Sequence, residues 1–165
     1  DAPQADIKAS VSAAMNLAVT TSVRLSDAPP QNITGSTGIV ASLIDAAGIP
    51  SAVMSMDWSL CAYLNAVLVG EKTTQINDSL RNKRTTPQMR ENLREVLNIL
   101  RGVCQTHLGE TLEFEEIAFR GDGQLRTPHW QTRLNSPSFM SFKQHFMALK
   151  LTGVGSGSLS IYLRP

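Results

Sequence analysis

The sequence predicts one α/β (α+β) domain over residues 1–165, in which long helices pack on a mainly antiparallel sheet. Two patterns predict this class: amphipathic helical segments with clear start and stop residues, and short β-prone runs that come in pairs joined by turns. Size is the third observation. A chain of 165 residues is long enough for one hydrophobic core and too short for two typical domains.

The N-terminal segments alternate between helix and strand patterns. Apolar residues recur at helical spacing from Ala5 to Val19, which predicts an amphipathic first helix. Two β-prone runs follow, Thr37–Asp45 and Ser51–Met56, and the Gly48–Pro50 step between them predicts a hairpin.

The two central helices have explicit boundary signals. The first is expected to begin near Ser55 or Asp57, either of which can cap a helix, and to end at Gly70. The second begins at Thr86–Pro87, because Thr is a favoured N-cap and Pro fits the first helical position. Its apolar pattern extends to about His107.

The remaining segments divide into two polar connections and three strands. Glu71–Thr85 is polar, and Thr127–Ser138 contains several Pro and Ser residues, so both are expected to be irregular. Thr111–Phe119 predicts a strand, and the pair Phe142–Leu151 and Ser158–Leu163 predicts a closing hairpin. An exposed edge on that hairpin would suit a homodimer.

The charge balance argues against two classes of partner. The chain has 15 basic and 14 acidic residues, so its net charge of +1 offers no attraction for nucleic acid or an anionic membrane surface. Apolar runs of about 18 residues, which a spanning helix requires, are absent from the sequence. We therefore expect neither a nucleic-acid nor a membrane partner.

The cysteine and histidine residues predict neither disulfides nor a metal site. Cys61 and Cys104 lie in apolar stretches without a C-x-x-C motif, which favours buried free thiols in a reducing, cytoplasmic compartment. The three histidines are scattered, so no zinc ligand set is expected. The chain begins at Asp1 rather than Met, which fits removal of a signal peptide or, as we favour, trimming of the expressed sequence.

The second central helix carries a polar face opposite its apolar stripe. At about 100° per residue, Glu91, Glu95, Asn98 and Gly102 fall on the outward side, and Glu95 and Asn98 are surface neighbours. A solvated face is the usual explanation for such a pair. However, Asn is a weak helix former, and Gly inside a helix costs about 1 kcal/mol relative to Ala. A Gly one turn beyond Asn98 leaves room for another molecule's backbone, so this face is predicted to be a docking surface. The apolar stripe comprises Met89, Leu93, Val96, Leu97, Leu100, Val103 and Cys104.

This helix, MRENLREVLNILRGV, is similar to the signature helix of the CheC/CheX family of chemotaxis phosphatases. In that helix an acidic or Ser residue is followed by Glu and then Asn, which places Glu91, Glu95 and Asn98 at the family positions. The resemblance extends over the first hairpin and the first long helix, from Asn32 to Ala118, and the closing hairpin is similar as well. It implies a CheC-like duplicated helix–strand architecture.

The resemblance also implies an activity: dephosphorylation of the aspartyl phosphate of a CheY-type response regulator. Asn98 would orient the attacking water, Glu95 would pair with the regulator's lysine, and Glu91, Arg94 and Gly102 would contact the partner. Magnesium would belong to the phosphorylated regulator, so the chain would need no cofactor of its own.

Two features leave alternatives open. The family pattern has a Pro where this chain has Arg120, and the first long helix has Ala62 in place of the site carboxylate, which leaves one site at most. A non-enzymatic binding module on the same fold, similar to the related flagellar-switch domains, is therefore the second hypothesis. A third is an unrelated function on a shared architecture, because fold alone does not specify chemistry.

Overall fold

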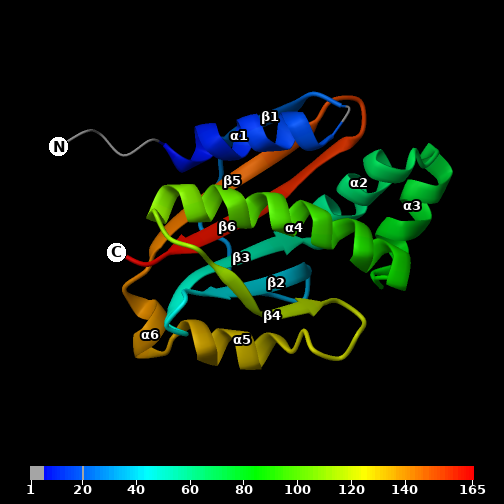
Figure 1. The fold of residues 1–165 in the computed structure, drawn as a ribbon. Helices are drawn as coiled ribbons and strands as arrows, with labels where there is room; N and C mark the ends of the chain where they lie inside the picture. The colour runs from blue at the N-terminus through cyan, green and yellow to red at the C-terminus, as the bar shows by residue number, and fades with distance from the viewer. Residues whose placement is uncertain (1–5, 20) are drawn as a thin grey trace.

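The computed structural model describes residues 6–19 and 21–165, which form an antiparallel sheet with helices on both faces (Figure 1). Within these residues the six-stranded sheet has the order β1-β5-β6-β3-β2-β4. The strands are β1 (Val23–Asp27), β2 (Thr37–Ile44), β3 (Pro50–Asp57), β4 (Glu113–Phe119), β5 (Lys143–Leu151) and β6 (Gly155–Leu163). The helices are α1 (Ile7–Ala18), α2 (Trp58–Val69), α3 (Thr73–Asn82), α4 (Pro87–Leu108), α5 (Thr127–Leu134) and α6 (Pro137–Met140).

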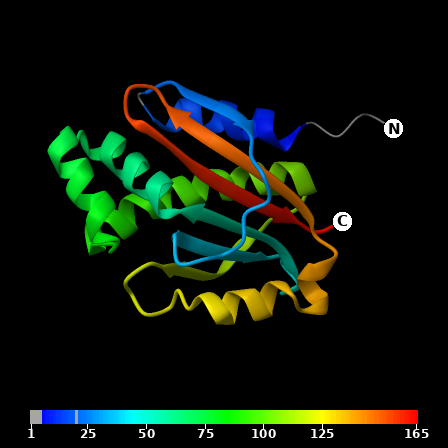
Figure 2. The same ribbon diagram turned by 180° about the vertical axis from the view of Figure 1, so that it is seen from behind.

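The helices cover the two sheet faces unequally. Helices α1 and α4 lie side by side across one face, and α2 and α3 gather at one end of it (Figure 1). The larger hydrophobic core lies beneath them and includes the fully buried Met15 and Leu93. Figure 2 shows the opposite face, where residues 28–36 cross the sheet and α5 lies near β4. A smaller apolar cluster there includes Val53 and Trp130.

The predicted boundaries of both central helices are confirmed. Asp57 caps α2, because its carboxylate accepts a hydrogen bond of 2.8 Å from the backbone N–H of Leu60, and Gly70 ends the helix with a φ of 68°. Thr86 caps α4 by accepting 3.2 Å from the N–H of Met89. The first helix is also present, although its predicted start at Ala5 lies outside the described residues.

Both segments predicted to be irregular contain helices instead. In Glu71–Thr85, helix α3 forms because the Gln75 side chain accepts from the N–H of Lys72 and because the Trp58 indole donates to the Ser79 carbonyl over 3.1 Å. In Thr127–Ser138, helices α5 and α6 form over the smaller core cluster. Local capping and tertiary packing together stabilise these helices. The polar composition of both segments outweighed these local start signals in the prediction.

The closing hairpin occupies the middle of the sheet, so the expectation of an exposed edge on it is wrong. Strand β5 pairs with β1 as well as β6, and β6 pairs with β3. The edges of the sheet are β1 and β4. Strand β6 also begins earlier than predicted, at Gly155 instead of Ser158. The sequence pattern placed Gly155 and Gly157 in a loop, whereas in the structure they belong to the strand and lie beneath α2.

Those glycines allow α2 to lie close against β6. A Cβ atom added to Gly155 would stand 2.4 Å from the Tyr63 ring, and one added to Gly157 would stand 2.5 Å from the backbone nitrogen of Leu60. Contacts this short are sterically forbidden for real side chains. At Gly157 the nearest atom is helix backbone, so the position of α2 depends on the absence of a side chain there, whereas at Gly155 the Tyr63 ring would have to move.

The two cysteines are free and buried, as predicted. Cys61 lies in α2 and Cys104 in α4, and burial raises the pKa of the Cys104 thiol to about 12. Among the described residues, no helix combines the length and the hydropathy that crossing a bilayer demands.

Candidate functional site

Helix α4 presents the predicted site residues along its outward side. The stripe predicted to be apolar, from Met89 to Cys104, is buried in full against the sheet and α1. Glu91, Glu95 and Asn98 are exposed on the other side, as the periodicity predicted. The structure thus brings the acidic residue, Glu and Asn together on one continuous helical surface.

Glu95 and Asn98 are free to engage another molecule. Within residues 6–19 and 21–165, neither side chain has a hydrogen-bond or ion-pair partner. The carboxamide of Asn98 offers one acceptor oxygen and two donor hydrogens, and the carboxylate of Glu95 offers acceptors only. Together they present donors, acceptors and a negative charge on adjacent turns of a rigid element.

Gly102 has no packing role in the isolated chain. A Cβ atom added there would find nothing within 4 Å, and its backbone is ordinary α-helix. Alanine would therefore fit and would favour the helix. The gap that this glycine leaves beside Asn98 is consistent with the predicted docking surface.

An apolar side chain also belongs to this face, and the sequence pattern did not single it out. Ile99, next to Asn98, is 36% exposed although α4 is otherwise apolar only on its buried side. A single exposed isoleucine is common on protein surfaces. Its position beside Asn98 and Gly102 makes it a natural contact for a docked partner.

A row of arginines borders the face on the side of β4. The guanidinium of Arg94 lies 5.1 Å from the centre of the Phe119 ring, and that of Arg101 lies 5.5 Å from the Phe114 ring. Cation–π contacts of this kind hold a flexible side chain in place. Arg94 is thus exposed but supported, which places a positive charge next to the two glutamates.

The corresponding position in the other central helix is not a second site. Asn65 of α2 is 8% exposed, and its carboxamide oxygen accepts a 3.0 Å hydrogen bond from Asn92 of α4. Its amide nitrogen donates to Glu71 over 3.3 Å. Ala62 is buried as well. Asn65 therefore ties α2 to α4, and the outward face of α4 remains the single candidate.

Arg120, which stands where the family pattern has Pro, connects the start of α4 to the rest of the fold. Its side chain donates to the carbonyls of Lys83, Gly35 and Thr37, the first over 3.0 Å. Its own carbonyl accepts from both the N–H and the hydroxyl of Thr85. These bonds join the loop before α4 to the loop before β2, and nothing in the local sequence around Arg120 indicated this role.

Replacing Arg120 with alanine should lower the free energy of unfolding by about 2 kcal/mol, because hydrogen bonds from a charged donor contribute about 1.5–3 kcal/mol. Urea unfolding followed by circular dichroism measures the change. Arg24→Ala is the control, since Arg24 is exposed on the edge strand β1. Equal stabilities for the two variants would contradict the bridging role of Arg120.

The described residues hold no group of three or more His, Cys, Asp or Glu side chains arranged to bind a metal ion. The two imidazoles closest to each other belong to His107 and His145, whose ring centres are 6.4 Å apart at the far end of α4. Burial lowers the pKa of His145, helped by the positive charge of Lys143. This pair lies away from the Glu95–Asn98 face.

No protein-family model and no curated protein sequence matches this chain. Solved structures do share its fold. The middle domain of FliM from Vibrio alginolyticus matches with a TM-score of 0.61 and 12% identity, over 96% of this chain and 88% of that one. FliY from Thermotoga maritima matches with a TM-score of 0.62 and 12% identity, over 96% and 84%.

CheX from Borrelia burgdorferi, in a complex with CheY, BeF3 and magnesium, matches with a TM-score of 0.54 and 12% identity, over 96% of both chains. The chain therefore has the fold shared by CheX and the FliM middle domain, with helices packed on a six-stranded antiparallel sheet. The predicted fold class and the predicted CheC/CheX-like architecture are confirmed. At these identities the likeness concerns the fold alone.

Proposed function

We propose that this chain removes the phosphoryl group from the aspartyl phosphate of a CheY-type response regulator. One observation carries the proposal: Glu95 and Asn98 stand free and adjacent on the outward face of α4, in a fold shared with CheX. The fold contributes a rigid helix, and the two side chains contribute the groups that the reaction requires.

The reaction is hydrolysis at phosphorus. Water attacks the phosphorus atom, the bond between phosphorus and the aspartyl oxygen breaks, and inorganic phosphate leaves while the regulator's carboxylate is restored. Catalysis of such a transfer depends mainly on in-line positioning and on stabilisation of charge. The Asn98 carboxamide would accept a hydrogen bond from the water and direct its lone pair at phosphorus. The regulator would supply magnesium and the remaining charge stabilisation.

The neighbouring residues would set the register of the complex. Glu95 would pair with the regulator's lysine, and Glu91, one turn earlier, would extend the same acidic edge. Arg94, supported by Phe119, would meet an acidic group of the regulator. Charge pairs of this kind contribute more to orientation and association rate than to affinity. Gly102 would let the regulator's backbone approach Asn98.

A second candidate function is a binding module without turnover. Two observations favour it: the FliM middle domain and FliY share the fold, and Arg120 replaces the Pro of the phosphatase pattern. The same face of α4 would then bind a response regulator or a flagellar protein without activating water.

One experiment separates the two functions. CheY-type regulators are phosphorylated with acetyl phosphate, and release of inorganic phosphate is followed with and without this chain. Binding to the same regulators loaded with beryllofluoride, a stable mimic of the phosphoryl group, is measured in parallel. Accelerated release supports the phosphatase. Binding without acceleration supports the module, and neither effect with any regulator would contradict both.

A further inference from the structure

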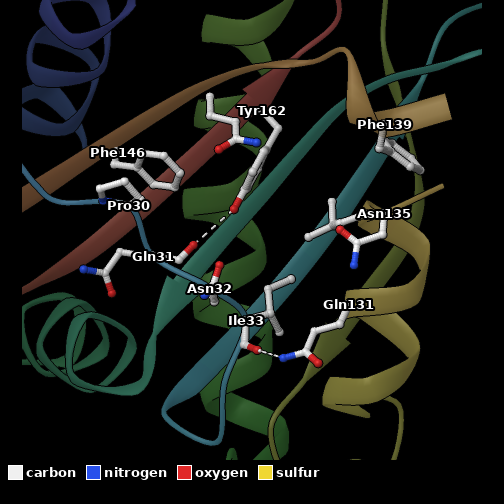
Figure 3. Close-up of a pocket in the computed structure, with 11 residues that line it drawn as sticks. Pro30, Gln31, Asn32, Ile33, Gln131, Asn135, Phe139, Phe146 and Tyr162 are labelled. Carbon is white, nitrogen blue, oxygen red and sulfur yellow. Dashed lines mark hydrogen bonds between the residues drawn. The ribbon is translucent and has the colours of Figure 1, made fainter. Parts of the chain in front are cut away.

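A cavity of about 290 Å³ lies on the sheet face opposite α4 (Figure 3). Its walls come from residues 30–33 before β2, from α5 and the residue after it, from Phe139 of α6, and from strands β5 and β6. Neither the Glu95–Asn98 face nor the proposed phosphatase reaction involves this cavity. Its size is close to the lower end of the range typical of small-molecule sites.

The lining is rich in carboxamides and lacks charge. The chain has eight Gln and eight Asn residues, and five of these sixteen line this one cavity: Gln31, Asn32, Gln131, Asn135 and Gln144. The other lining residues are Pro, aliphatic or aromatic, so the wall contains no ionised side chain. A charged ligand would find no counter-ion here, whereas a neutral polar ligand would find donors and acceptors together.

The apolar part of the lining, which we call the floor, is largely aromatic and includes Ile33 at the end of the wall formed by residues 30–33. Ile33, Phe139 and Tyr162 are each less than 7% exposed, and the ring of Phe146 stands edge-to-face against Tyr162 at 5.9 Å. Burial raises the pKa of the Tyr162 hydroxyl, which therefore stays protonated and neutral. Phe146 is the partly exposed member of this group, so its ring offers the apolar surface against which a ligand ring can lie.

Two hydrogen bonds hold the wall formed by residues 30–33. The Gln131 side chain donates to the Ile33 carbonyl over 2.9 Å, and the Tyr162 hydroxyl donates to the Gln31 carbonyl over 3.3 Å (Figure 3). Among the described residues, the side chains of Asn32, Asn135 and Gln144 have no hydrogen-bond partner. Gln131 and Tyr162 thus hold the wall in place, and the three free carboxamides lie on three different walls of the cavity.

We propose that this cavity binds a neutral carbohydrate of one or two sugar rings. A sugar has hydroxyls around its perimeter and an apolar C–H face, which matches free carboxamides on three walls above an aromatic floor. A nucleobase would need a narrow slot between two apolar faces. The bonds from Gln131 and Tyr162 hold the wall formed by residues 30–33 at two points, so this wall is in place without a ligand.

The test is a titration of the full chain followed by amide NMR shifts. The probes are glucose, galactose, mannose, N-acetylglucosamine, maltose and cellobiose, with glucose 6-phosphate, glucuronate, adenosine and trialanine as competing classes. We expect at least one neutral sugar to bind with a dissociation constant of about 1 mM or below, with shifts around residues 30–33 and α5. The two charged sugars should bind at least tenfold more weakly.

Asn135→Ala should weaken the binding of that sugar at least tenfold. Its side chain is exposed and makes no bond within the described residues, so the variant should fold normally. Asn77→Ala is the matched control, an exposed carboxamide on α3, and should bind like the wild type. The proposal is overturned if no neutral sugar shows binding at a sugar concentration of about 20 mM, 20-fold above the expected dissociation constant. It is also overturned if adenosine or trialanine binds more tightly than every neutral sugar, or if Asn135→Ala does not change the affinity.

Discussion

Replacing Asn98 with alanine should reduce the stimulation of regulator dephosphorylation by about 100-fold or more, because loss of precise positioning alone costs a factor of this size. The fold should not change, since Asn98 is exposed and bonds to no other side chain in the described part of the chain. Phosphate release at saturating regulator measures the rate, and binding to the beryllofluoride-loaded regulator measures the affinity. The rate of phosphate release should fall by this factor, while the affinity for the beryllofluoride-loaded regulator should change little.

Two variants of the same helix sharpen this test. Gln88→Ala removes another exposed carboxamide near the start of α4 and should leave the rate unchanged. Glu95→Ala removes the proposed partner of the regulator's lysine and should raise the KM more than it lowers the kcat. An Asn98→Ala protein that is as fast as the wild type would refute the assigned role of Asn98, even if the chain proves to be a phosphatase.

Replacing Gly157 with alanine should lower the free energy of unfolding by about 3 kcal/mol, the upper end of the cost of overpacking a well-packed site. The added Cβ atom would stand 2.5 Å from the Leu60 nitrogen and 2.6 Å from the Asp57 carboxylate. The first neighbour is helix backbone and the second is the capping group of α2, so neither can move without displacing the helix. Urea unfolding at constant m-value measures the loss.

Gly102→Ala is the matched control for this substitution. It also adds one methyl group to a glycine, but within α4, where no atom lies within 4 Å of the new Cβ. It should stabilise the protein by about 1 kcal/mol, the difference in helix propensity. The two variants should therefore shift stability in opposite directions. If the Gly157→Ala variant were as stable as the wild type, the close packing of α2 against β6 would be contradicted.

The candidate site could be predicted from the sequence because its signals are local. The spacing of the apolar residues from Met89 to Cys104 decides which side of α4 faces the sheet, and helical periodicity then places Glu91, Glu95 and Asn98 outward. Capping by Asp57 and Thr86 depends on residues within one turn of each helix start. Such features need no knowledge of distant segments.

Long-range packing accounts for what the sequence pattern missed. Helices α3 and α5 lie in segments of polar composition, and they pack where the Trp58 indole reaches the Ser79 carbonyl and where Trp130 enters the smaller core cluster. The central position of the closing hairpin follows from pairing of β5 with β1, which is far away in the sequence. Arg120 meets Gly35 and Lys83, which are 85 and 37 residues away in the sequence.

The sequence alone therefore specified the helix that carries Glu95 and Asn98 and the direction in which they point, because neighbouring residues on one helix settle both. The order of the strands, the role of Arg120 and the carboxamide-lined cavity arose only in the folded chain. In the lining of that cavity, Gln31 contacts Tyr162, which is 131 residues further along the sequence. Contacts between such distant residues depend on how every intervening element packs, and no local pattern records that information.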